Sequence, residues 1–267
     1  MRRGEKCYSV LSMTLRYALI TGASSGIGTA AALALAADGN AVWLTYTGGE
    51  AAAREAADAC IAAGAPEAHV SRLDLRDPAS IEALVAEVEA RWGKLHVLIN
   101  NGGVCPYRAF DDITIDEWDA VMETNGRGTF LLTRAALPLL RAAAGTPEAP
   151  IDRSVVNLSS IAGQQGALKT GMHYAASKGA ILALTRSFAR GLAAEGIRVN
   201  AVTPGPVVSA ITDHLQGPAR DALTSSIPLG DFGQPDDVAW IIAALASPKA
   251  AFTTGATYDV NGGVRID

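Results

Sequence analysis

Residues 21–28 read Thr21-Gly22-Ala23-Ser24-Ser25-Gly26-Ile27-Gly28, with three glycines in the spacing Gly-x-x-x-Gly-x-Gly. The short apolar run 16–21 predicts a buried strand ending in this stretch, and the Ala- and Leu-rich run 29–38 predicts a helix after it. Glycines between a strand and a helix let the backbone turn sharply and approach a pyrophosphate, whose charge a helix N-terminus favours. The stretch therefore predicts the first unit of a dinucleotide-binding domain. The alternative is a tight turn that binds nothing.

Apolar runs and helical runs continue to alternate along the rest of the chain. Predicted strands cover 41–46, 69–73, 96–100, 154–158 and 198–202, and predicted helices cover 50–63, 78–92, 116–143 (kinked at Pro138) and 172–190. Strict alternation means parallel strands joined by right-handed crossovers. The predicted fold class is α/β, a single-domain Rossmann-type doubly wound parallel sheet with helices on both faces. We expect residues 1–14 to be an N-terminal extension and 15–267 to form one domain.

Composition excludes several classes of function. Of the 267 residues, 49% are hydrophobic and 18% charged, and the formal net charge is −5. No cluster of Lys and Arg indicates a nucleic-acid or membrane-surface role, and no apolar run reaches the roughly 18 residues of a membrane span. Cys7, Cys60 and Cys105 show no metal-ligand spacing, so we expect reduced thiols in a cytoplasmic protein and no metal site.

Tyr174 and Lys178 lie four residues apart in the predicted helix 172–190, so their side chains project from one face. An ammonium group beside a phenol favours the phenolate and lowers the pKa of the phenol. The pair therefore predicts a general acid for reducing a carbonyl, or a base for oxidising an alcohol. Taken alone, the spacing is also that of an ordinary solvated helix face.

Three motifs together resemble the short-chain dehydrogenase/reductase family: the glycine loop 21–28, Asn100-Asn101-Gly102-Gly103 and Tyr174-x-x-x-Lys178. The resemblance covers residues 13–263. Within the family, the chain resembles the 3-oxoacyl-(acyl-carrier-protein) reductases overall. The resemblance implies a sheet of about seven strands, the last of them near 259–263. Two positions depart from the family pattern, with Gly102 in place of Ala and Gly126 in place of a larger apolar residue.

The resemblance also implies which residues bind a nicotinamide dinucleotide. The glycine loop would hold the pyrophosphate, Asp74 would accept from the adenine amine, and the segment after Pro204 would hold the nicotinamide carboxamide. The complete set is Gly22, Ser24, Ser25, Gly26, Ile27, Gly28, Tyr46, Thr47, Asp74, Leu75, Asn101, Gly102, Tyr174, Lys178, Pro204, Gly205, Val207 and Ser209.

Cofactor choice is predicted from the end of the second strand. NAD-binding proteins of this fold carry an Asp or Glu there for the ribose 2′-hydroxyl, whereas this chain has Tyr46. That position therefore carries no carboxylate, which would repel the 2′-phosphate of NADP(H). Ser24, Ser25 and Thr47 could donate to the phosphate, and Arg54 could reach it. We therefore expect NADP(H), with NAD(H) as the alternative.

Four residues match the catalytic positions of the family, namely Asn125, Ser160, Tyr174 and Lys178. Reduction of a carbonyl places negative charge on its oxygen, so donors aimed at that oxygen stabilise the transition state. The resemblance implies that Tyr174 gives it a proton and Ser160 hydrogen-bonds it. Lys178 would lower the pKa of Tyr174 and hold the ribose, while Asn125 would anchor a water linking Lys178 to solvent. Ser160 lies one residue further from Tyr174 than is usual, so Ser159 is the alternative.

Two nearby residues invite other roles. His173 precedes Tyr174, but one residue turns a helix by about 100°, so we expect the imidazole to form a wall of the substrate pocket. Cys105 has no base or cation in view, and we expect it to pack rather than to act as a nucleophile.

Segment 206–226 is expected to be a substrate lid with an apolar side. That side would carry Ile211, Leu215 and Leu223, continuing to Ile227. An apolar lid suits ketones, including 3-oxoacyl thioesters. We therefore expect a carbonyl reductase. The remote alternative, a non-catalytic cofactor-sensing regulator, conflicts with the presence of all four catalytic residues.

A sugar substrate is the closer alternative. Segment 104–108 resembles that of aldose 1-dehydrogenases in the same family. The polar residues that could bind sugar hydroxyls are Gln164, Gln165, Lys169 and His173. We also expect a homotetramer, because the long predicted helices 116–143 and 172–190 carry more apolar surface than one sheet face can cover.

Overall fold

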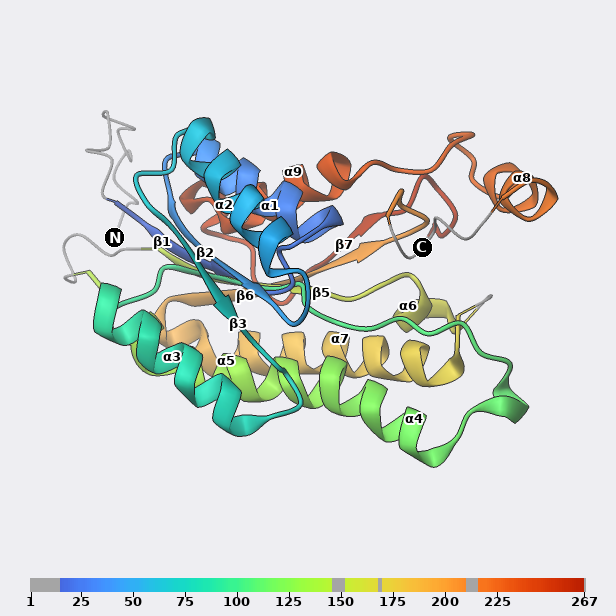
Figure 1. The fold of residues 1–267 in the computed structure, drawn as a ribbon, viewed down its shortest axis with the longest axis horizontal. Helices are drawn as coiled ribbons and strands as arrows, with labels where there is room; N and C mark the ends of the chain where they lie inside the picture. Colours follow the sequence, from blue (N-terminus) through green and yellow to red (C-terminus); the bar gives the residue numbers. More distant parts are fainter. Residues whose placement is uncertain (1–14, 146–151, 168–169, 210–215, 267) are drawn as a thin grey trace, which may run out of the picture.

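The computed structural model describes residues 15–145, 152–167, 170–209 and 216–266. Its centre is one sheet of seven parallel strands in the order β3-β2-β1-β4-β5-β6-β7, with helices above and below it in Figure 1. The strands are β1 (Tyr17–Ile20), β2 (Ala41–Tyr46), β3 (Ala68–Arg72), β4 (Val97–Asn100), β5 (Arg153–Leu158), β6 (Ile197–Pro204) and β7 (Thr257–Val260). The predicted doubly wound sheet is thereby confirmed. Its strand order reverses between β1 and β4, where such sheets open a crevice for a ligand.

Helices connect the strands as the alternating pattern predicts, and the bounds of β2, α2 and α3 are those expected from the sequence. The helices are α1 (Gly26–Ala37), α2 (Glu50–Ala63), α3 (Pro78–Trp92), α4 (Ile115–Val121), α5 (Gly128–Ala142), α6 (Ala162–Gln165), α7 (Met172–Leu192), α8 (Pro218–Ser225) and α9 (Pro235–Ala246). Shorter turns are η1 (Phe110–Asp112), η3 (Ala193–Glu195) and η4 (Pro248–Ala250).

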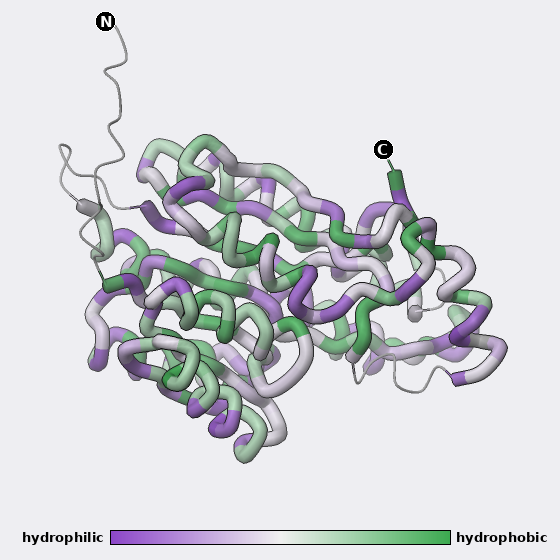
Figure 2. Tube along the Cα trace, turned by 90° about the horizontal axis from the view of Figure 1, so that it is seen from above, coloured by the Kyte–Doolittle hydropathy of each residue, from purple (hydrophilic) through white to green (hydrophobic). Residues whose placement is uncertain are grey.

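Each face of the sheet has its own apolar core. Side chains alternate along a strand, so Ala18 and Ile20 pack with α1, α2 and α9, whereas Leu19 packs with α3, α5 and α7. Figure 2 shows hydrophobic (green) and hydrophilic (purple) stretches interspersed along the tube. The two cores hold the sheet rigid, so the loops at its carboxyl edge have fixed starting points.

The predicted helix 116–143 is wrong in one respect, because it is divided. The π-helical segment η2 (Met122–Arg127) separates α4 from α5. Asn125 in η2 directs its side chain to Val104 and Ser177, outside its own helix. Short π-helical segments within α-helices often occur at functional sites. Pro138, where a kink was expected, lies inside α5.

Among the helices described, none is long and apolar enough to cross a membrane. The predicted extension 1–14 lies outside the described residues, as do Lys169, Ile211 and Leu215.

Candidate active site

The glycine loop joins β1 to α1 in the form that the sequence predicts. Gly22 and Gly26 adopt positive φ angles of 63° and 55°, which favour glycine. A Cβ on Gly28 would lie 2.5 Å from Asn101 Nδ2 and closer still to the Gly22 carbonyl oxygen. Helix α1 begins at Gly26 rather than at residue 29, and no side chain caps it at Ser25. Its first N–H groups are thus free for an anion, so the loop fits a pyrophosphate.

Asn101, the residue that follows β4, supports this loop. Its Nδ2 donates to the carbonyl oxygens of Thr21 (2.8 Å) and Gly22 (3.0 Å). The Thr21 hydroxyl in return accepts from the backbone N–H groups of Asn101 and Gly102. Asn101 was expected to bind the cofactor and lines the pocket, but its side-chain amide donates to the protein side of the loop.

Gly102, which departs from the family pattern, lies close to two side chains. A Cβ there would lie 3.1 Å from Leu75 Cδ1 and 3.2 Å from Thr21 Oγ1. Leu75, predicted to bind the cofactor, is 7% exposed and belongs to the core beneath α3 and α5. Asp74 Oδ1 accepts from the Arg76 N–H, which turns the chain after β3. Asp74 thus lies at the carboxyl edge, while the side chain of Leu75 packs inward.

The end of β2 carries the residues that were expected to select the cofactor. Tyr46 is the last residue of the strand. The Thr47 hydroxyl donates to the Leu73 carbonyl at 2.8 Å, so the expected donation from Thr47 to a phosphate is already used within the protein. Arg54 pairs with Glu50 at 2.6 Å on the exposed start of α2. This carboxylate four residues after Tyr46 was overlooked in the sequence.

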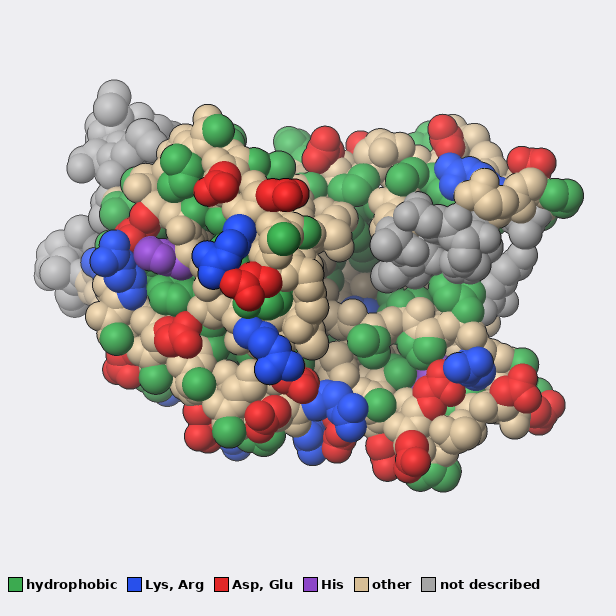
Figure 3. Space-filling model, viewed as in Figure 1, with side chains coloured by type: hydrophobic (Ala, Val, Ile, Leu, Met, Phe, Trp, Pro, Cys, Tyr) green, Lys and Arg blue, Asp and Glu red, His purple; other side chains and the backbone are tan. Residues whose placement is uncertain are grey.

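A pocket opens at the carboxyl ends of β1, β4, β5 and β6. Figure 3 shows the molecule hollowed between the part that carries α8 and the part that carries α4. The predicted residues that line it are Ile27, Asn101, Ser160, Tyr174, Lys178, Pro204, Gly205, Val207, Ser209 and Leu223. The sequence thus located both walls of the pocket, one from the glycine loop and one from α7.

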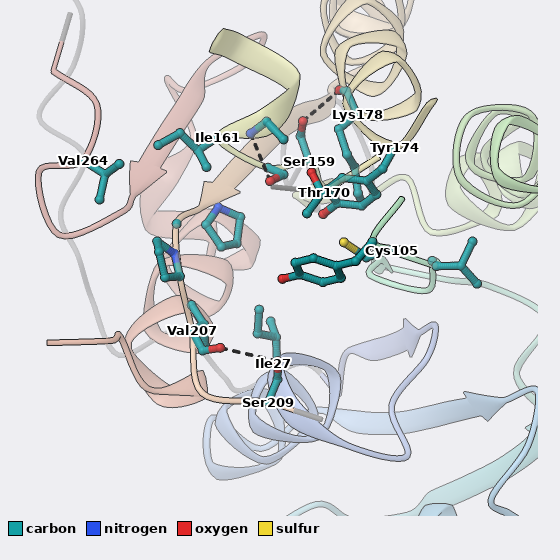
Figure 4. Close-up of a pocket in the computed structure, with 18 of the residues that line it drawn as sticks. Ile27, Cys105, Ser159, Ile161, Thr170, Tyr174, Lys178, Val207, Ser209 and Val264 are labelled. Carbon is teal, nitrogen blue, oxygen red and sulfur yellow. Dashed lines mark hydrogen bonds between the residues drawn. The ribbon is translucent and has the colours of Figure 1, made fainter. Parts of the chain in front are cut away.

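Tyr174, Lys178 and Ser160 meet inside this pocket. Lys178 Nζ lies 5.7 Å from the Tyr174 ring centroid and donates to the Leu158 carbonyl at 2.7 Å. The side chains of Ser160 and Cys105 line the same pocket and lie near enough to the Tyr174 hydroxyl to influence its pKa. Ser159 Oγ instead donates to the Lys178 carbonyl (Figure 4), so Ser159 fixes the helix while Ser160 faces Tyr174. The geometry favours Ser160 over its alternative.

Burial dominates the acid–base properties of the pocket. The expected lowering of the Tyr174 pKa by Lys178 is not found, because burial raises the Tyr174 pKa. Burial also lowers the pKa of Lys178 to about 8 and raises that of Cys105 to about 11. Tyr174 is therefore a protonated donor at neutral pH, and the Cys105 thiol is neutral, in agreement with the expectation that it is no nucleophile.

Asn125 is fully engaged as a structural bridge. Its Oδ1 accepts from the Val104 N–H, and its Nδ2 donates to the Val104 carbonyl and to Ser177 Oγ, all at 2.9 Å. The side chain thus attaches the segment after β4 to α7. A water-anchoring role is left to the backbone of Asn125, because its amide group is occupied.

Three of the expected substrate contacts lie elsewhere. His173 is fully buried against Trp118 of α4, so its predicted place in the pocket wall is wrong. Gln164 donates to Asp259 Oδ1 of β7, and Gln165 is exposed. Neither glutamine lines the pocket, and the polar set suggested for sugar hydroxyls therefore does not assemble among the residues described.

Other lining residues were not named as site residues, because their positions depend on long-range folding. Ile161, Thr170 and Val264 face the pocket, together with Cys105, which was expected only to pack, and Tyr107, which lies in the segment 104–108 compared above with aldose 1-dehydrogenases. Figure 4 shows Ile161 and Val264 on one side of the pocket and Cys105 on the other. Val264 follows the turn after β7, and no local pattern links that turn to Tyr174. For Ile161 alone the sequence offered a local signal, because this apolar residue directly follows Ser160.

The carboxyl edge of this sheet suits a protein that moves hydride to or from a nicotinamide dinucleotide, so its class is that of the NAD(P)-dependent oxidoreductases. A family model described as Enoyl-(Acyl carrier protein) reductase matches residues 22–265. The chain belongs to the short-chain dehydrogenase/reductase family, whose enzymes use NAD(H) or NADP(H).

Similar proteins cover nearly the whole chain. A 3-oxoacyl-(acyl-carrier-protein) reductase FabG of Staphylococcus aureus is 38% identical over 249 residues, which is 92% of this chain and 97% of that protein. The 3-oxoacyl-(acyl-carrier-protein) reductase of Synechocystis sp. is 34% identical over 256 residues, covering 95% and 98%. The Pseudomonas aeruginosa RhlG/NADP active-site complex superposes with a TM-score of 0.88 at 31% identity, covering 96% and 98%.

Proposed function

We propose that this enzyme reduces a ketone, of the 3-oxoacyl thioester type or a small apolar analogue, to a secondary alcohol with NADPH. One observation carries the proposal: Tyr174, with Ser160 and Lys178 beside it, lines a pocket with mostly apolar walls. A general acid that stays protonated is what reduction needs, since the carbonyl oxygen must gain a proton.

Each residue of the site has a separate task in this reaction. A bound nicotinamide supplies the hydride to the carbonyl carbon. Ser160 Oγ donates to the carbonyl oxygen as its charge grows, and Tyr174 transfers its phenolic proton there. The Lys178 ammonium then stabilises the phenolate until a proton returns. Asn125 takes no proton itself but holds Val104 and α7 in place.

The cofactor is proposed to be NADP(H), with NAD(H) used less well. Tyr46 occupies the position of the ribose-binding acid, and Glu50, the nearby carboxylate, is paired with Arg54 at 2.6 Å. The guanidinium of Arg54 is exposed and has further N–H groups that can donate to a 2′-phosphate while the pair with Glu50 stays in place. The resemblance to the P. aeruginosa RhlG/NADP complex supports this choice. A kcat/KM for NADH equal to that for NADPH would contradict it.

Apolar walls support a ketone rather than a sugar as substrate. Val104, Ile161, Val207, Leu223 and Val264 line the pocket, and a sugar site needs several side chains that hydrogen-bond its hydroxyls. The relatives named as 3-oxoacyl-(acyl-carrier-protein) reductases support the thioester in particular.

The deciding assay compares acetoacetyl thioesters and small ketones with NADPH against aldoses with NADP⁺ or NAD⁺. Oxidation or reduction of the cofactor is followed by its absorbance, and Tyr174→Phe serves as the matched control. We expect reduction of the ketones alone. Turnover of aldoses without any ketone reduction would establish the sugar dehydrogenase instead.

We further propose a homotetramer in the cytoplasm. A shallow apolar hollow lies across η2, α5 and α7, lined by Met122, Phe130, Ala180, Ala183 and Leu184. Helix α9 contacts the outer strand β7, and these two elements expose Trp240 (70% exposed) and Tyr258 (36% exposed). Two such surfaces suit two symmetric interfaces. Light scattering should give four times the subunit mass of 27.5 kDa, and a monomer would reject the assembly.

A further inference from the structure

His173, the residue before Tyr174 on α7, is buried without a hydrogen bond. It is 0% exposed, and its ring stacks on Trp118 of α4 with centroids 6.5 Å apart and planes inclined by 20°. Neither ring nitrogen has a hydrogen-bond partner within the described part of the chain. Buried polar groups nearly always have partners, so an unpaired imidazole beside a catalytic residue calls for a functional explanation.

A carboxylate lies close to this imidazole. Glu117 Oε1 is 3.7 Å from His173 Nε2, which is slightly too long for a hydrogen bond. Both oxygens of Glu117 also accept from Arg108 Nε, at 3.2 and 3.1 Å. Glu117 is therefore shared between α7 and the segment that follows β4, because Arg108 belongs to that segment.

The segment in question forms one wall of the substrate pocket. Within residues 104–109, which we call the substrate segment, Cys105 and Tyr107 line the pocket. Asn125 holds the start of the segment at Val104. The chain Arg108–Glu117–His173 would hold its end, and it leads to the residue adjoining Tyr174.

The start of α7 is shaped around the imidazole. The Gly171 N–H donates to the Pro106 carbonyl at 3.0 Å, which attaches the substrate segment to α7 a second time. A Cβ on Gly171 would overlap the His173 ring. The ring therefore has little freedom to turn away, and the approach of His173 to Glu117 depends mainly on the carboxylate.

We propose that His173 and Glu117 form a clamp that closes when substrate enters, with Nε2–H donating to the Glu117 carboxylate and so fixing Cys105 and Tyr107 against the substrate. His173 is in this view a positioning residue for substrate binding. Closure requires an approach of roughly 0.5–1 Å. Hydrogen bonds of active sites are often long before ligands bind and tighten in the complex. The inference rests on the proposed function, because it assumes a ketone in the pocket.

The test uses His173→Phe, which keeps a ring on Trp118 but removes both nitrogens, Glu117→Ala, and the double variant. The matched control is Asp116→Ala, an exposed acid in the same first turn of α4. We expect each clamp variant to raise the ketone KM roughly tenfold, the loss expected for one hydrogen bond to a charged group. The KM for NADPH and the kcat should change by less than about twofold, since neither cofactor nor proton transfer touches the clamp.

A double-mutant cycle tests whether His173 and Glu117 act together as a clamp or affect the ketone KM independently. The double variant should be no worse than the worse single variant, because both remove the same interaction. Glu117→Gln should restore most of the affinity, since its amide oxygen still accepts from Nε2–H. Additive losses in the double variant, or an unchanged ketone KM in Glu117→Ala, would overturn the proposal even if His173→Phe failed to fold.

Hydrogen exchange gives a readout that needs no turnover. In the complex with NADP⁺ and an acetoacetyl thioester, which cannot react because the cofactor carries no hydride, backbone amides within residues 104–109 should exchange faster in Glu117→Ala and His173→Phe than in Asp116→Ala. If the wild type reduced no ketone, the proposed function would fail while this comparison remained decisive for the clamp. Equal exchange in all three variants would reject the clamp.

Discussion

Replacing Gly28 with Ala tests the glycine loop at its most crowded point. The new Cβ would lie 2.5 Å from Asn101 Nδ2 and 2.9 Å from Ala23 Cα, and closer still to the Gly22 carbonyl oxygen. Backbone surrounds the site, so α1 must move away from β4. That shift breaks the two Asn101 hydrogen bonds to the loop, of 2.8 and 3.0 Å.

The magnitude follows from these contacts. Two neutral hydrogen bonds contribute about 1–3 kcal/mol, and overpacking costs a further 1–3 kcal/mol or so. Urea unfolding of Gly28→Ala should therefore show a stability loss of about 2–6 kcal/mol. Displacing one N–H of α1 from the pyrophosphate should weaken NADPH binding by roughly 10- to 150-fold.

Gly191→Ala is the matched control, because Gly191 lies on α7 with nothing within 4 Å of a new Cβ. Alanine should leave the NADPH affinity unchanged and raise stability by up to about 1 kcal/mol. Fluorescence titration of NADPH measures the affinity of both variants. Wild-type affinity in folded Gly28→Ala would refute the assignment of the loop to the cofactor.

Three further predictions concern the site and its support. Tyr174→Phe should lower kcat about 10²- to 10⁴-fold in the ketone assay while NADPH still binds; more than a tenth of the activity would exclude Tyr174 as the acid. The reduction rate should fall as pH rises through about 8, because the buried Lys178 loses its proton there; a pH profile flat from 7 to 9 or so would contradict this. Asp152→Ala should lower the free energy of unfolding in urea by about 3–5 kcal/mol, since it leaves the buried Arg198 guanidinium without its carboxylate partner. The Arg198 side chain is 7% exposed, and its Nε lies 2.7 Å from Asp152 Oδ1. The exposed Glu50→Ala, as its control, should cost less than about 1 kcal/mol.

The parts of the site that the sequence predicted are those set by local spacing. Glycine positions between β1 and α1, and the four-residue step from Tyr174 to Lys178, follow from loop and helix geometry alone. Strand β2 and helices α2 and α3 likewise end at local signals, such as the left-handed Gly64 and Gly93 that follow the helices.

The parts that the sequence did not predict depend on distant partners. The break at η2 accompanies Asn125 bonds to Val104 and Ser177, which lie 21 and 52 residues away. His173 was placed in the pocket from helical geometry, but Trp118 of α4 covers it. The direction of the Tyr174 pKa was wrong for a similar reason: the charge of Lys178 is visible in the sequence, whereas the burial that outweighs it is not.

The central claim is that this pocket transfers hydride from NADPH to a ketone carbon, with the proton coming from Tyr174. Its most direct test uses NADPH deuterated at C4 of the nicotinamide on the transferred face, an acetoacetyl thioester, and mass spectrometry of the product. We expect a hydroxyacyl thioester with deuterium on the carbinol carbon, formed at least about 100-fold more slowly by Tyr174→Phe than by the wild type. Cofactor oxidation without labelled alcohol, or equal labelling by the Phe variant, would contradict it.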